Sequence, residues 1–464
     1  MIRLFRHYVP QSLFLLSFCE GLILLGSFYL GRIIRTYTAP YTIAPLEELF
    51  LQAFVFVLVM LSILTGMGLY ERNFWDGKAD MILRVGVSFL LGLFVMTLIY
   101  YLIPTLYIGR VEFGYSFSIA FIGVVLARFV FIQISDQDIL KRRVMVLGSG
   151  VVAAQLERLM GDANIQGFKI VGYVSTENVH EHMQLEQVLK VQTNLLALAE
   201  THQIDEILVA TDDSQPGDLA DEVLECKVNG VEILDLLTFF ERETGKIKLD
   251  ALNPGSLIFS DGFHQAVLKR TSKRLFDILA SALILSLTWP VMLITAIAIW
   301  MESGFKGPIL YRQERVGRNE KIFQVIKFRS MHVDAERNGV AQWAQKNDTR
   351  VTHVGAFIRA TRIDELPQLI NVLKGNMSFV GPRPERPQFV AELSKTIPFY
   401  SMRHRVNPGI TGWAQICYPY GASEEDAKEK LQYDLYYIKN YSLFLDLVVL
   451  LETAHVIFWG KGAR

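Results

Sequence analysis

An uncharged apolar run extends from Ile278 to Met301 and is the feature that most limits how this chain can fold. It is long enough to cross ~30 Å of hydrocarbon as a helix, so its length alone predicts a membrane-spanning segment. Lysine and arginine crowd both flanks, and short basic flanks stay on the cytoplasmic side. Pro290 breaks the run, and Ser286 and Thr288 can satisfy carbonyls that the break frees. We therefore favour a re-entrant helix, which enters the membrane and turns back, over a spanning one.

Four more apolar runs occupy the first third of the chain, and they predict four transmembrane helices within residues 1–140. With 464 residues and 51% hydrophobic content, the chain is too long and too apolar for a single soluble domain. Basic residues favour the N-terminus and the chain after residue 141 on the cytoplasmic side. Glu20, Arg84 and Arg128 fall inside three of the runs and could pair within the bundle. The runs are Ser12–Gly31, Leu46–Tyr70, Met81–Pro104 and Tyr115–Ile134.

Residues 141–255 alternate apolar strands with helical stretches, which predicts a Rossmann-like module with a parallel sheet. Its first strand leads into Gly148-Ser149-Gly150-Val151-Val152-Ala153, a turn that can seat a pyrophosphate on a helix N-terminus. A tight strand-to-helix turn needs small residues even without a nucleotide. The acidic partner of a dinucleotide site is not obvious, and Glu177 is the nearest candidate. Nucleotide binding and a structural or regulatory role both stay open, and residues 256–272 are expected to form a linker.

Three polar clusters follow the re-entrant run. Arg383 stands between two prolines, which pre-set the backbone and hold its guanidinium on a stiff turn. A planar guanidinium of this kind suits phosphate oxygens, although a single arginine is more often part of a surface ion pair. The clusters contain Lys327, Arg329, Asp334 and Glu336; then Arg362, Asp364 and Glu365; then Arg383.

Six motifs carry a resemblance to the bacterial polyprenyl-phosphate phosphosugar transferases, and the whole chain resembles their large exopolysaccharide-type members. The resemblance implies a fold with four N-terminal transmembrane helices, a Rossmann-like module, a re-entrant helix at 273–301 and a mostly helical α/β catalytic domain at 302–464. It implies transfer of sugar 1-phosphate from a UDP-sugar to undecaprenyl phosphate, with release of UMP. The motifs are Lys273-Arg274-x-x-Asp277, Gly307–Gly317, Lys327–Met331, Asp364–Gln368, Gly381–Pro384 and Pro408–Trp413.

The resemblance also implies site residues. Asp334 would be the nucleophile that becomes phosphorylated, with Glu336 beside it and Mg²⁺ held by both. The small family members carry adjacent Asp-Glu, whereas Ala335 separates the two carboxylates here, and Asp364 with Glu365 is a competing pair. The phosphates would be bound by Lys327, Arg329, Arg362 and Arg383. Supporting roles are expected for Lys273, Arg274, Asp277, Pro290, Asp364 and Glu365.

The expected location is the bacterial inner membrane, with several membrane passes and the catalytic domain in the cytoplasm. The expected partners are a UDP-sugar, undecaprenyl phosphate and the lipid bilayer; nucleic acid is not expected, and a homodimer is left open. Two other functions remain open: an NAD-linked enzyme that modifies nucleotide sugars, and a non-catalytic membrane scaffold that senses them. The first would need a Tyr-x-x-x-Lys base, which residues 151–260 lack, and the second predicts no UMP release.

Overall fold

The structure is a computed structural model in which the chain forms two compact units, Met1–Arg3 with Tyr8–Gly245, and Leu4–His7 with Lys246–Arg464. The described residues are 2–4, 7–9, 11–38, 49–70, 78–136, 141–148, 168–174, 188–189, 194–210, 219–249, 267–305, 307–333, 350–418, 421 and 423–459. Two short strands, β1 (Ile2–Leu4) and β2 (His7–Val9), begin the chain.

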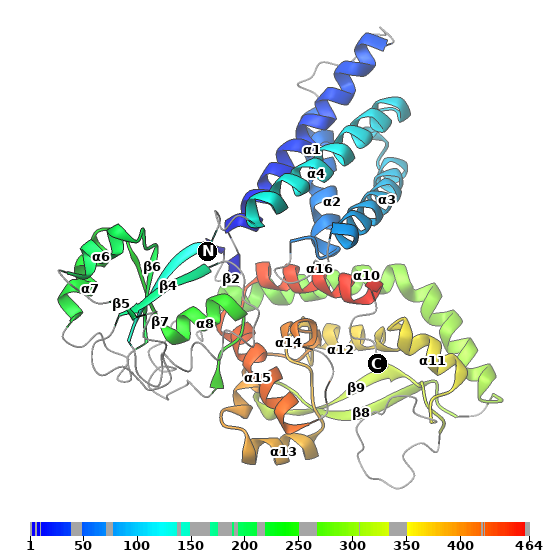
Figure 1. Ribbon diagram of the computed structural model, residues 1–464. Helices are drawn as coiled ribbons and strands as arrows, with labels where there is room; N and C mark the ends of the chain where they lie inside the picture. Colours follow the sequence, from blue (N-terminus) through cyan, green and yellow to red (C-terminus); the bar gives the residue numbers. More distant parts are fainter. Residues whose placement is uncertain are drawn as a thin grey trace. The chain divides into compact units, whose positions relative to one another are not determined.

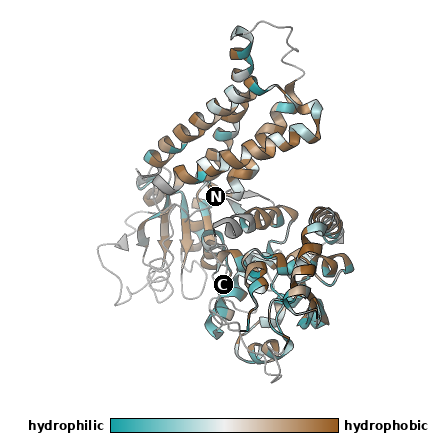
Figure 2. Ribbon diagram, turned by 90° about the vertical axis from the view of Figure 1, so that its right-hand side faces the viewer, coloured by the Kyte–Doolittle hydropathy of each residue, from teal (hydrophilic) through white to brown (hydrophobic). Residues whose placement is uncertain are grey.

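Four apolar helices follow, and much of their ribbon is coloured as hydrophobic in Figure 2. Three of them are long and apolar enough to cross a membrane, whereas α2 has 17 residues. The predicted run to Tyr70 is helical only to Gly66, because Gly68 has a φ of +71° and the chain turns there. The elements are α1 (Gln11–Thr38), α2 (Phe50–Gly66), α3 (Lys78–Leu102), η2 (Pro104–Leu106) and α4 (Arg110–Asp136), as Figure 1 shows.

Buried polar side chains gather around the end of α2. Arg128 and Glu20 are fully buried and form an ion pair of 2.7 Å, so the prediction that charges pair inside the bundle is confirmed for these two. Arg128 also donates to the carbonyl of Leu69, at 2.9 Å, and the Tyr70 hydroxyl donates to Glu20. Arg84 instead donates to the carbonyl of Met67, at 3.4 Å. The carbonyls after α2 are thus satisfied by side chains from α3 and α4.

The α/β module contains a five-stranded parallel sheet in the order β5-β4-β3-β6-β7, which confirms the predicted doubly wound arrangement. Gly148, directly after β3, has a φ of +131°, as the predicted turn requires. Ser149, Gly150 and Glu177 lie outside the described residues, so nucleotide binding there stays a prediction. The elements are β3 (Arg142–Leu147), β4 (Phe168–Val174), β5 (Val188–Leu189), α6 (Leu195–Thr201), β6 (Glu206–Val209), α7 (Ala220–Val228), β7 (Glu232–Asp235) and α8 (Leu236–Thr244).

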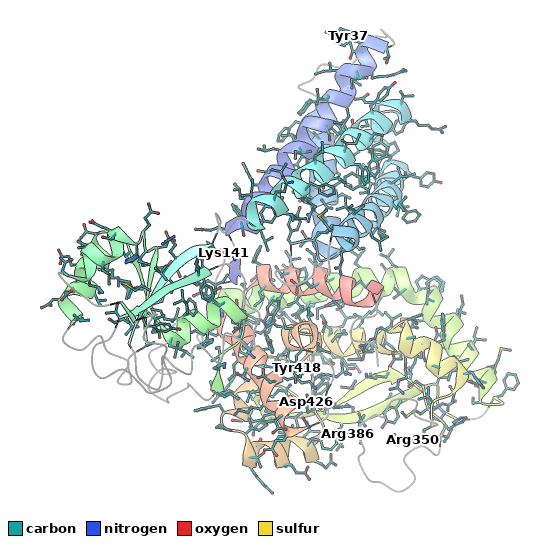
Figure 3. The ribbon with its side chains drawn as sticks, viewed as in Figure 1. Tyr37, Lys141, Arg350, Arg386, Tyr418 and Asp426 are labelled. Carbon is teal, nitrogen blue, oxygen red and sulfur yellow. The ribbon has the colours of Figure 1, made fainter. Side chains whose placement is uncertain are left out.

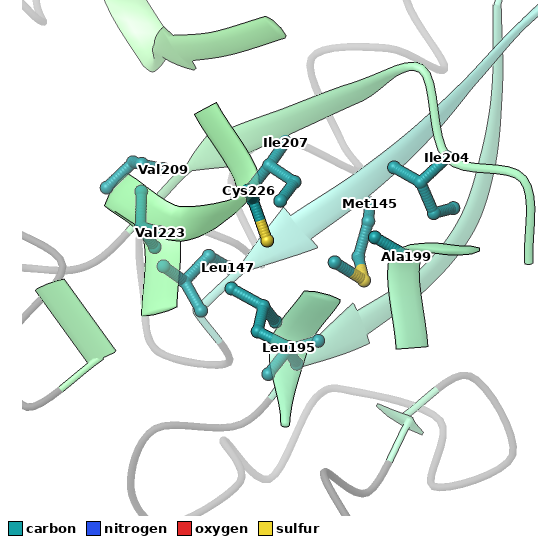
Figure 4. Close-up of a cluster of buried hydrophobic side chains, with 10 residues drawn as sticks. Met145, Leu147, Leu195, Ala199, Ile204, Ile207, Val209, Val223 and Cys226 are labelled. Carbon is teal, nitrogen blue, oxygen red and sulfur yellow. The ribbon is translucent and has the colours of Figure 1, made fainter. Parts of the chain in front are cut away.

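Alternate residues of β3 fill two apolar cores, one on each face of this sheet. Met145 and Leu147 pack against α6 and α7 in a cluster that includes Cys226, as Figure 4 shows. Val144 and Val146 face the other way and join the cluster that contains Phe239 and Phe240 of α8. A strand buried on both faces has no polar alternation, which explains why β3 reads as a continuous apolar run.

An ion network closes the edge of the sheet where the strands begin. Glu206, the first residue of β6, accepts from Arg142 at 2.6 Å and from Arg242 at 2.5 Å. Glu243 accepts from the same two arginines, at 2.7 and 3.0 Å. Burial alone would raise the pKa of Glu206, but its hydrogen bonds and attraction to Arg242 and Arg142 lower it. The network holds α8 to the start of β3 and β6.

The second unit begins with α10 (Val267–Glu302), which starts within the segment predicted as a linker. The ribbon of α10 bends in Figure 1, and the helix contains Pro290, the usual cause of a kink. Ser286 and Thr288 donate to the carbonyls of Leu283 and Ile284, at 2.7 and 2.8 Å. The prediction that they satisfy the freed carbonyl was wrong in detail, since Pro290 frees the carbonyl of Ser286 itself. Such back-bonding favours bending instead.

The remaining elements of this unit are short and are joined by tight turns. Two hairpin strands pair antiparallel, and two three-residue strands pair in parallel. The strands are β8 (Leu310–Val316), β9 (Ile322–Phe328), β10 (Ser378–Val380) and β11 (Gly409–Thr411). The α-helices are α11 (His353–Ala360), α12 (Gln368–Lys374), α13 (Pro387–Thr396), α14 (Trp413–Cys417), α15 (Glu424–Lys439) and α16 (Leu443–Trp459). The 3₁₀ turns are η6 (Arg318–Glu320), η7 (Ile363–Glu365) and η8 (Tyr400–Arg405).

We expect Glu206→Gln to destabilise the α/β module by about 3–5 kcal/mol, because it leaves the buried Arg242 and the partly buried Arg142 with one carboxylate fewer. The contribution of Glu206 is present above its unfolded pKa of ~4.3 and is lost as the pH falls through its lower folded value. Wild type should therefore lose stability more steeply than the variant on acidification below ~4.3. Thermal unfolding of the detergent-purified full chain measures both effects.

The matched control is Glu232→Gln. Glu232 also contacts Arg242, at 3.4 Å, but its side chain is 55% exposed, so its loss should cost less than about 1 kcal/mol. Equal destabilisation by the two variants would show that burial of the network does not increase its contribution to the free energy of unfolding.

Candidate active site

The two predicted catalytic carboxylates, Asp334 and Glu336, lie outside the described residues. The chain on either side of them is described and is paired. Met331 and Val351 form an antiparallel bridge, and the amide of His332 donates to the carbonyl of Arg350 at 3.0 Å. Residues 331–332 and 350–351 therefore lie side by side, shortly after the end of β9 along the chain. Arg350 is labelled in Figure 3.

Arg329 follows β9 directly and is 9% exposed. Its amide donates to the carbonyl of Ile309 at 2.9 Å, which fixes the backbone. The Nη1 atom of its guanidinium is buried and has no hydrogen-bond partner among the described residues. Gly307 lies against it: a Cβ on Gly307 would be 2.6 Å from Nη1 and 3.1 Å from Val333. The guanidinium is thus packed beside Val333, the residue that precedes Asp334.

Glu365 of η7 is the centre of a cation cluster, which comprises Lys327, Arg362 and Arg383 together with Glu365. Its Oε1 atom lies 2.9 Å from Lys327 Nζ, 3.7 Å from Arg383 Nη2 and 3.9 Å from Arg362 Nη1. Burial opposes ionisation of Glu365, but the three cations lower its pKa to about 2. The structure therefore brings together one residue from each of the three predicted polar clusters, with three positive charges around this carboxylate.

Asp364 lies next to Glu365 in η7, and Arg362 directly precedes η7. Asp364 is 8% exposed, and burial raises its pKa although Lys327 opposes the rise. Arg362 has a φ of +57°, a left-handed conformation that is costly for arginine and that the surrounding structure must hold in place. Glu365 is engaged with three cations, which makes it a counter-ion and a weak nucleophile. Asp364 and Glu365, the alternative to Asp334 and Glu336 as the catalytic pair, are therefore less suited to covalent chemistry than the sequence alone indicated.

The Arg383 turn depends on glycines because two backbones touch. β10 and β11 pair through Ser378 with Gly409 and Val380 with Thr411. A Cβ on Gly409 would lie 2.1 Å from the Gly381 nitrogen, and one on Gly412 would lie 2.2 Å from the Gly381 carbonyl oxygen. The Gly-Pro-Arg-Pro and Pro-Gly-Ile-Thr-Gly motifs are therefore two halves of one packed structure that carries Arg383.

Three predicted supporting residues attach the start of α10 to this domain. Lys273 is buried and pairs with Asp446 of α16 at 2.7 Å. Arg274 donates to the carbonyls of Val372 and Leu373 at the end of α12, at 2.5 and 2.7 Å. Asp277 accepts from the hydroxyl of Ser378 and the amide of Phe379 in β10, at 3.1 Å each. All three roles are structural, and the partner Asp446 was not foreseen.

The end of α10 packs on the same domain. Ile299 is buried against Phe328 of β9 and Ile358 of α11, and Glu302 accepts from the amide of Val354 at 3.1 Å. Between its two attached ends α10 exposes large apolar side chains, among them Leu287, Trp289 and Ile294. Pro290 lies within this exposed stretch. The helix thus has a bilayer-suited face and both ends on one domain.

The described residues contain no group of three histidine, cysteine, aspartate or glutamate side chains able to hold a metal ion. The described part of the site is cationic: Lys327, Arg329, Arg362 and Arg383 suit phosphate oxygens and not a cation. The predicted Mg²⁺ ligands, Asp334 and Glu336, belong to the stretch that the structure does not describe. Mg²⁺ binding therefore stays a prediction.

The sequence did not predict several contacts in and around the site. Gly307 was noticed only as part of a motif, although its contact with Arg329 gives it a specific role. Asn371 of α12 accepts from the amide of Ile326 at 3.0 Å and donates to the carbonyl of Gln324 at 2.8 Å, which fixes β9. Further along, Tyr418 donates to Asp426 at the start of α15, at 3.0 Å, and both are labelled in Figure 3. None of these contacts is local enough to be read from spacing.

Two family matches cover most of the chain. Residues 268–460 match the family described as bacterial sugar transferase, and residues 66–234 match the family described as CoA-binding domain. The first match begins at the start of α10 and includes every described residue of the cation cluster.

The names of similar proteins agree with the sugar transferase match. The chain is 43% identical over 256 residues to the UDP-N-acetylgalactosamine-undecaprenyl-phosphate N-acetylgalactosaminephosphotransferase of Aeromonas hydrophila, which covers 54% of this chain and 58% of that protein. It is 32% identical over 331 residues to the undecaprenyl-phosphate glucose phosphotransferase of Komagataeibacter xylinus, covering 70% and 60%. It is 44% identical over 183 residues to the UDP-glucose:undecaprenyl-phosphate glucose-1-phosphate transferase of Caulobacter vibrioides, covering 39% and 67%. The first two alignments thus span less than two thirds of those relatives. On these matches, the chain belongs to the bacterial sugar transferase family.

Proposed function

We propose that the protein transfers sugar 1-phosphate from a UDP-sugar to undecaprenyl phosphate, giving undecaprenyl-diphosphate-sugar and UMP, and so initiates exopolysaccharide or related glycan synthesis. The observation that supports this most is the cation cluster around Glu365, which falls within the matched residues 268–460. The relatives' names include both UDP-glucose and UDP-N-acetylgalactosamine as donors. The sugar that this chain accepts therefore stays open.

Arg329, Lys327, Arg362 and Arg383 bind the donor's diphosphate in this proposal. A buried guanidinium nitrogen without a hydrogen-bond partner is costly, and a phosphate oxygen next to Arg329 would remove that cost. The three cations around Glu365 exceed its single charge, so this side of the site also favours an anion. Charge that develops on the leaving UMP is stabilised by the same groups.

The transfer proceeds in two displacements. A carboxylate oxygen of Asp334 attacks the β-phosphorus, a bond to that phosphorus forms, and UMP leaves with the electron pair of the bridging oxygen. A phosphate oxygen of undecaprenyl phosphate then attacks the same phosphorus and releases Asp334. The two phosphate substrates, which repel each other, thus never need to react directly. Glu336 assists beside Asp334, and Mg²⁺ held by these two carboxylates would neutralise phosphate charge.

α10 acts as a re-entrant helix in this proposal. Its start is bonded to α12, α16 and β10, and its end is packed on β9 and α11. A domain bonded to both ends of one helix cannot have those ends on opposite faces of a ~30 Å hydrocarbon layer. The basic flanks then put the domain on the cytoplasmic side of the bacterial inner membrane, where UDP-sugars are expected.

Gly307→Ala should lower kcat/KM for the UDP-sugar by at least about tenfold with little loss of stability. The new Cβ would lie 2.6 Å from Nη1 of Arg329, and Gly307 has a φ of +87° that alanine disfavours. Steady-state kinetics in membranes measures the effect. Gly304→Ala is the matched control, since Gly304 also has a positive φ, +62°, but has open space around it. Equal losses in both variants would mean that backbone strain alone is responsible.

Asp334→Asn keeps the size of the side chain but removes the nucleophilic charge, so turnover should fall by several orders of magnitude. Labelled UDP-sugars offered with undecaprenyl phosphate, followed by extraction of the lipid product, measure turnover and identify the donor. Without lipid acceptor, wild type should retain label as an acyl phosphate that hydroxylamine releases, and Asp334→Asn should retain none.

Asp364→Asn is the control for that experiment. If Asp334→Asn still traps label and Asp364→Asn does not, the nucleophile has been assigned to the wrong carboxylate. Lipid product without any trapped label would favour a direct transfer, and no lipid product from any UDP-sugar would contradict the proposed function itself.

Single cysteines test the membrane arrangement. In a chain without its three native cysteines, an impermeant thiol reagent should label cysteine at Gly255 or Glu320 only after cells are permeabilised. Cysteine at Thr42, on the predicted outer connection between the first two apolar runs, should be labelled in intact cells. Labelling of the Glu320 position in intact cells would exclude the re-entrant arrangement.

Pro290→Ala should straighten α10 and lower activity, because it restores the hydrogen bond to the Ser286 carbonyl.

A further inference from the structure

The turn that carries Arg383 is held by its carbonyl groups. Pro382 and Pro384 have no amide hydrogen, so the turn itself offers two backbone donors fewer. Instead each of four successive carbonyls accepts a hydrogen bond from a different group. The donors are the amide of Gly409 to Pro382 at 3.0 Å, Arg403 to Arg383 at 3.1 Å, Arg315 to Pro384 at 2.9 Å and the amide of Val316 to Glu385 at 2.9 Å.

Arg403 supplies the bond to Arg383 itself. Proline fixes φ at both neighbours, so the free torsions near Arg383 are its own φ and ψ and the ψ of Pro382. A hydrogen bond to the Arg383 carbonyl limits ψ at that residue. The direction in which the Arg383 side chain leaves the turn follows from these torsions, and its guanidinium reaches 3.7 Å from Glu365.

Arg403 is itself rigidly held. It is 7% exposed, its Nη1 donates to the hydroxyl of Tyr400 at 2.6 Å, and its Nη2 pairs with Asp434 of α15 at 2.8 Å. Its guanidinium also lies over the Tyr400 ring, 5.1 Å from the centroid. Burial raises the pKa of Asp434 to about 6, while the charge of Arg403 opposes the rise. One guanidinium therefore joins η8, α15 and the Arg383 turn.

We propose that Arg403 is a positioning residue for phosphate binding: it does not touch the donor but sets the direction of Arg383 through the Arg383 carbonyl. This rests on the proposed function, in which Arg383 binds the diphosphate of a UDP-sugar. A lysine at position 403 could keep the charge next to Asp434 but could not bond Tyr400, Asp434 and the Arg383 carbonyl together, because it lacks the guanidinium fork.

A double-mutant cycle tests this with UDP as the probe, whose binding does not depend on the unknown sugar. The dissociation constant of UDP is measured on the detergent-purified full chain for wild type, Arg403→Lys, Arg383→Lys and the double variant. We expect each single variant to weaken binding about tenfold, and the double variant to bind within about twofold of Arg383→Lys. A residue that acts only through Arg383 has nothing further to lose once Arg383 is changed.

Several outcomes would overturn the proposal. If the two losses multiply to about a hundredfold, or if Arg403→Lys leaves UDP binding unchanged, Arg403 does not act through Arg383. If Arg383→Lys itself has no effect, the phosphate role of Arg383 is wrong and the positioning role fails with it. Multiplying losses alone leave the proposed function intact, so the two failures are distinguishable.

Two further variants and thermal unfolding test whether a loss of UDP binding comes only from a loss of folding. Asp434→Asn keeps an oxygen acceptor for Arg403 and should weaken UDP binding less than Arg403→Lys does. Glu429→Gln, on the same helix α15, breaks the half-buried pair with Lys246, at 2.9 Å, and should leave UDP binding within about twofold of wild type. Thermal unfolding of each variant shows whether it is folded. A loss of affinity that tracks the unfolding temperature across all variants, including Glu429→Gln, would reduce Arg403 to a purely structural residue.

Discussion

Three polar side chains within one turn of α10 attach a helix with a large apolar surface to a charged domain. Lys273, Arg274 and Asp277 bond to α16, α12 and β10 respectively. α12 in turn fixes β9 through Asn371, and β10 pairs with the strand that supports the Arg383 turn. Removing these bonds would leave buried charges unpaired, and the loss of folding free energy would be far larger than for a surface contact. The position of the cation cluster relative to α10 therefore depends on this attachment.

A second constraint is the repulsion among the cations that a phosphate site needs. Lys327, Arg362 and Arg383 approach one another only because Glu365 lies between them and stays ionised. A carboxylate with a pKa of about 2 keeps its charge throughout the physiological range. The three cations outnumber this one carboxylate, so the cluster suits an anion, as the proposed function requires.

Much of this could be predicted from the sequence, where the signal is local. The long apolar runs predicted α1, α3, α4 and α10, and the shorter apolar stretches predicted β3, β4, β6 and β7. The three polar clusters supplied the cations of the site. The length of α2 was not predictable, because it ends where Gly68 turns and where distant arginines satisfy the carbonyls that follow the helix. The counter-ion role of Glu365 and the contact of Gly307 with Arg329 were hidden for the same reason: both depend on residues far away in sequence.

The ion pair between Glu20 and Arg128 has a consequence for biogenesis. The two residues are separated by 108 positions, so α1 is synthesised well before its partner helix α4. A lone charge within an apolar helix costs roughly 2.5–3.5 kcal/mol on insertion scales, whereas the completed pair is fully buried and bonded. The charge of Glu20 is therefore compensated only once α4 has been made, so the stability of α1 in the bundle depends on a helix that follows it by about 100 residues.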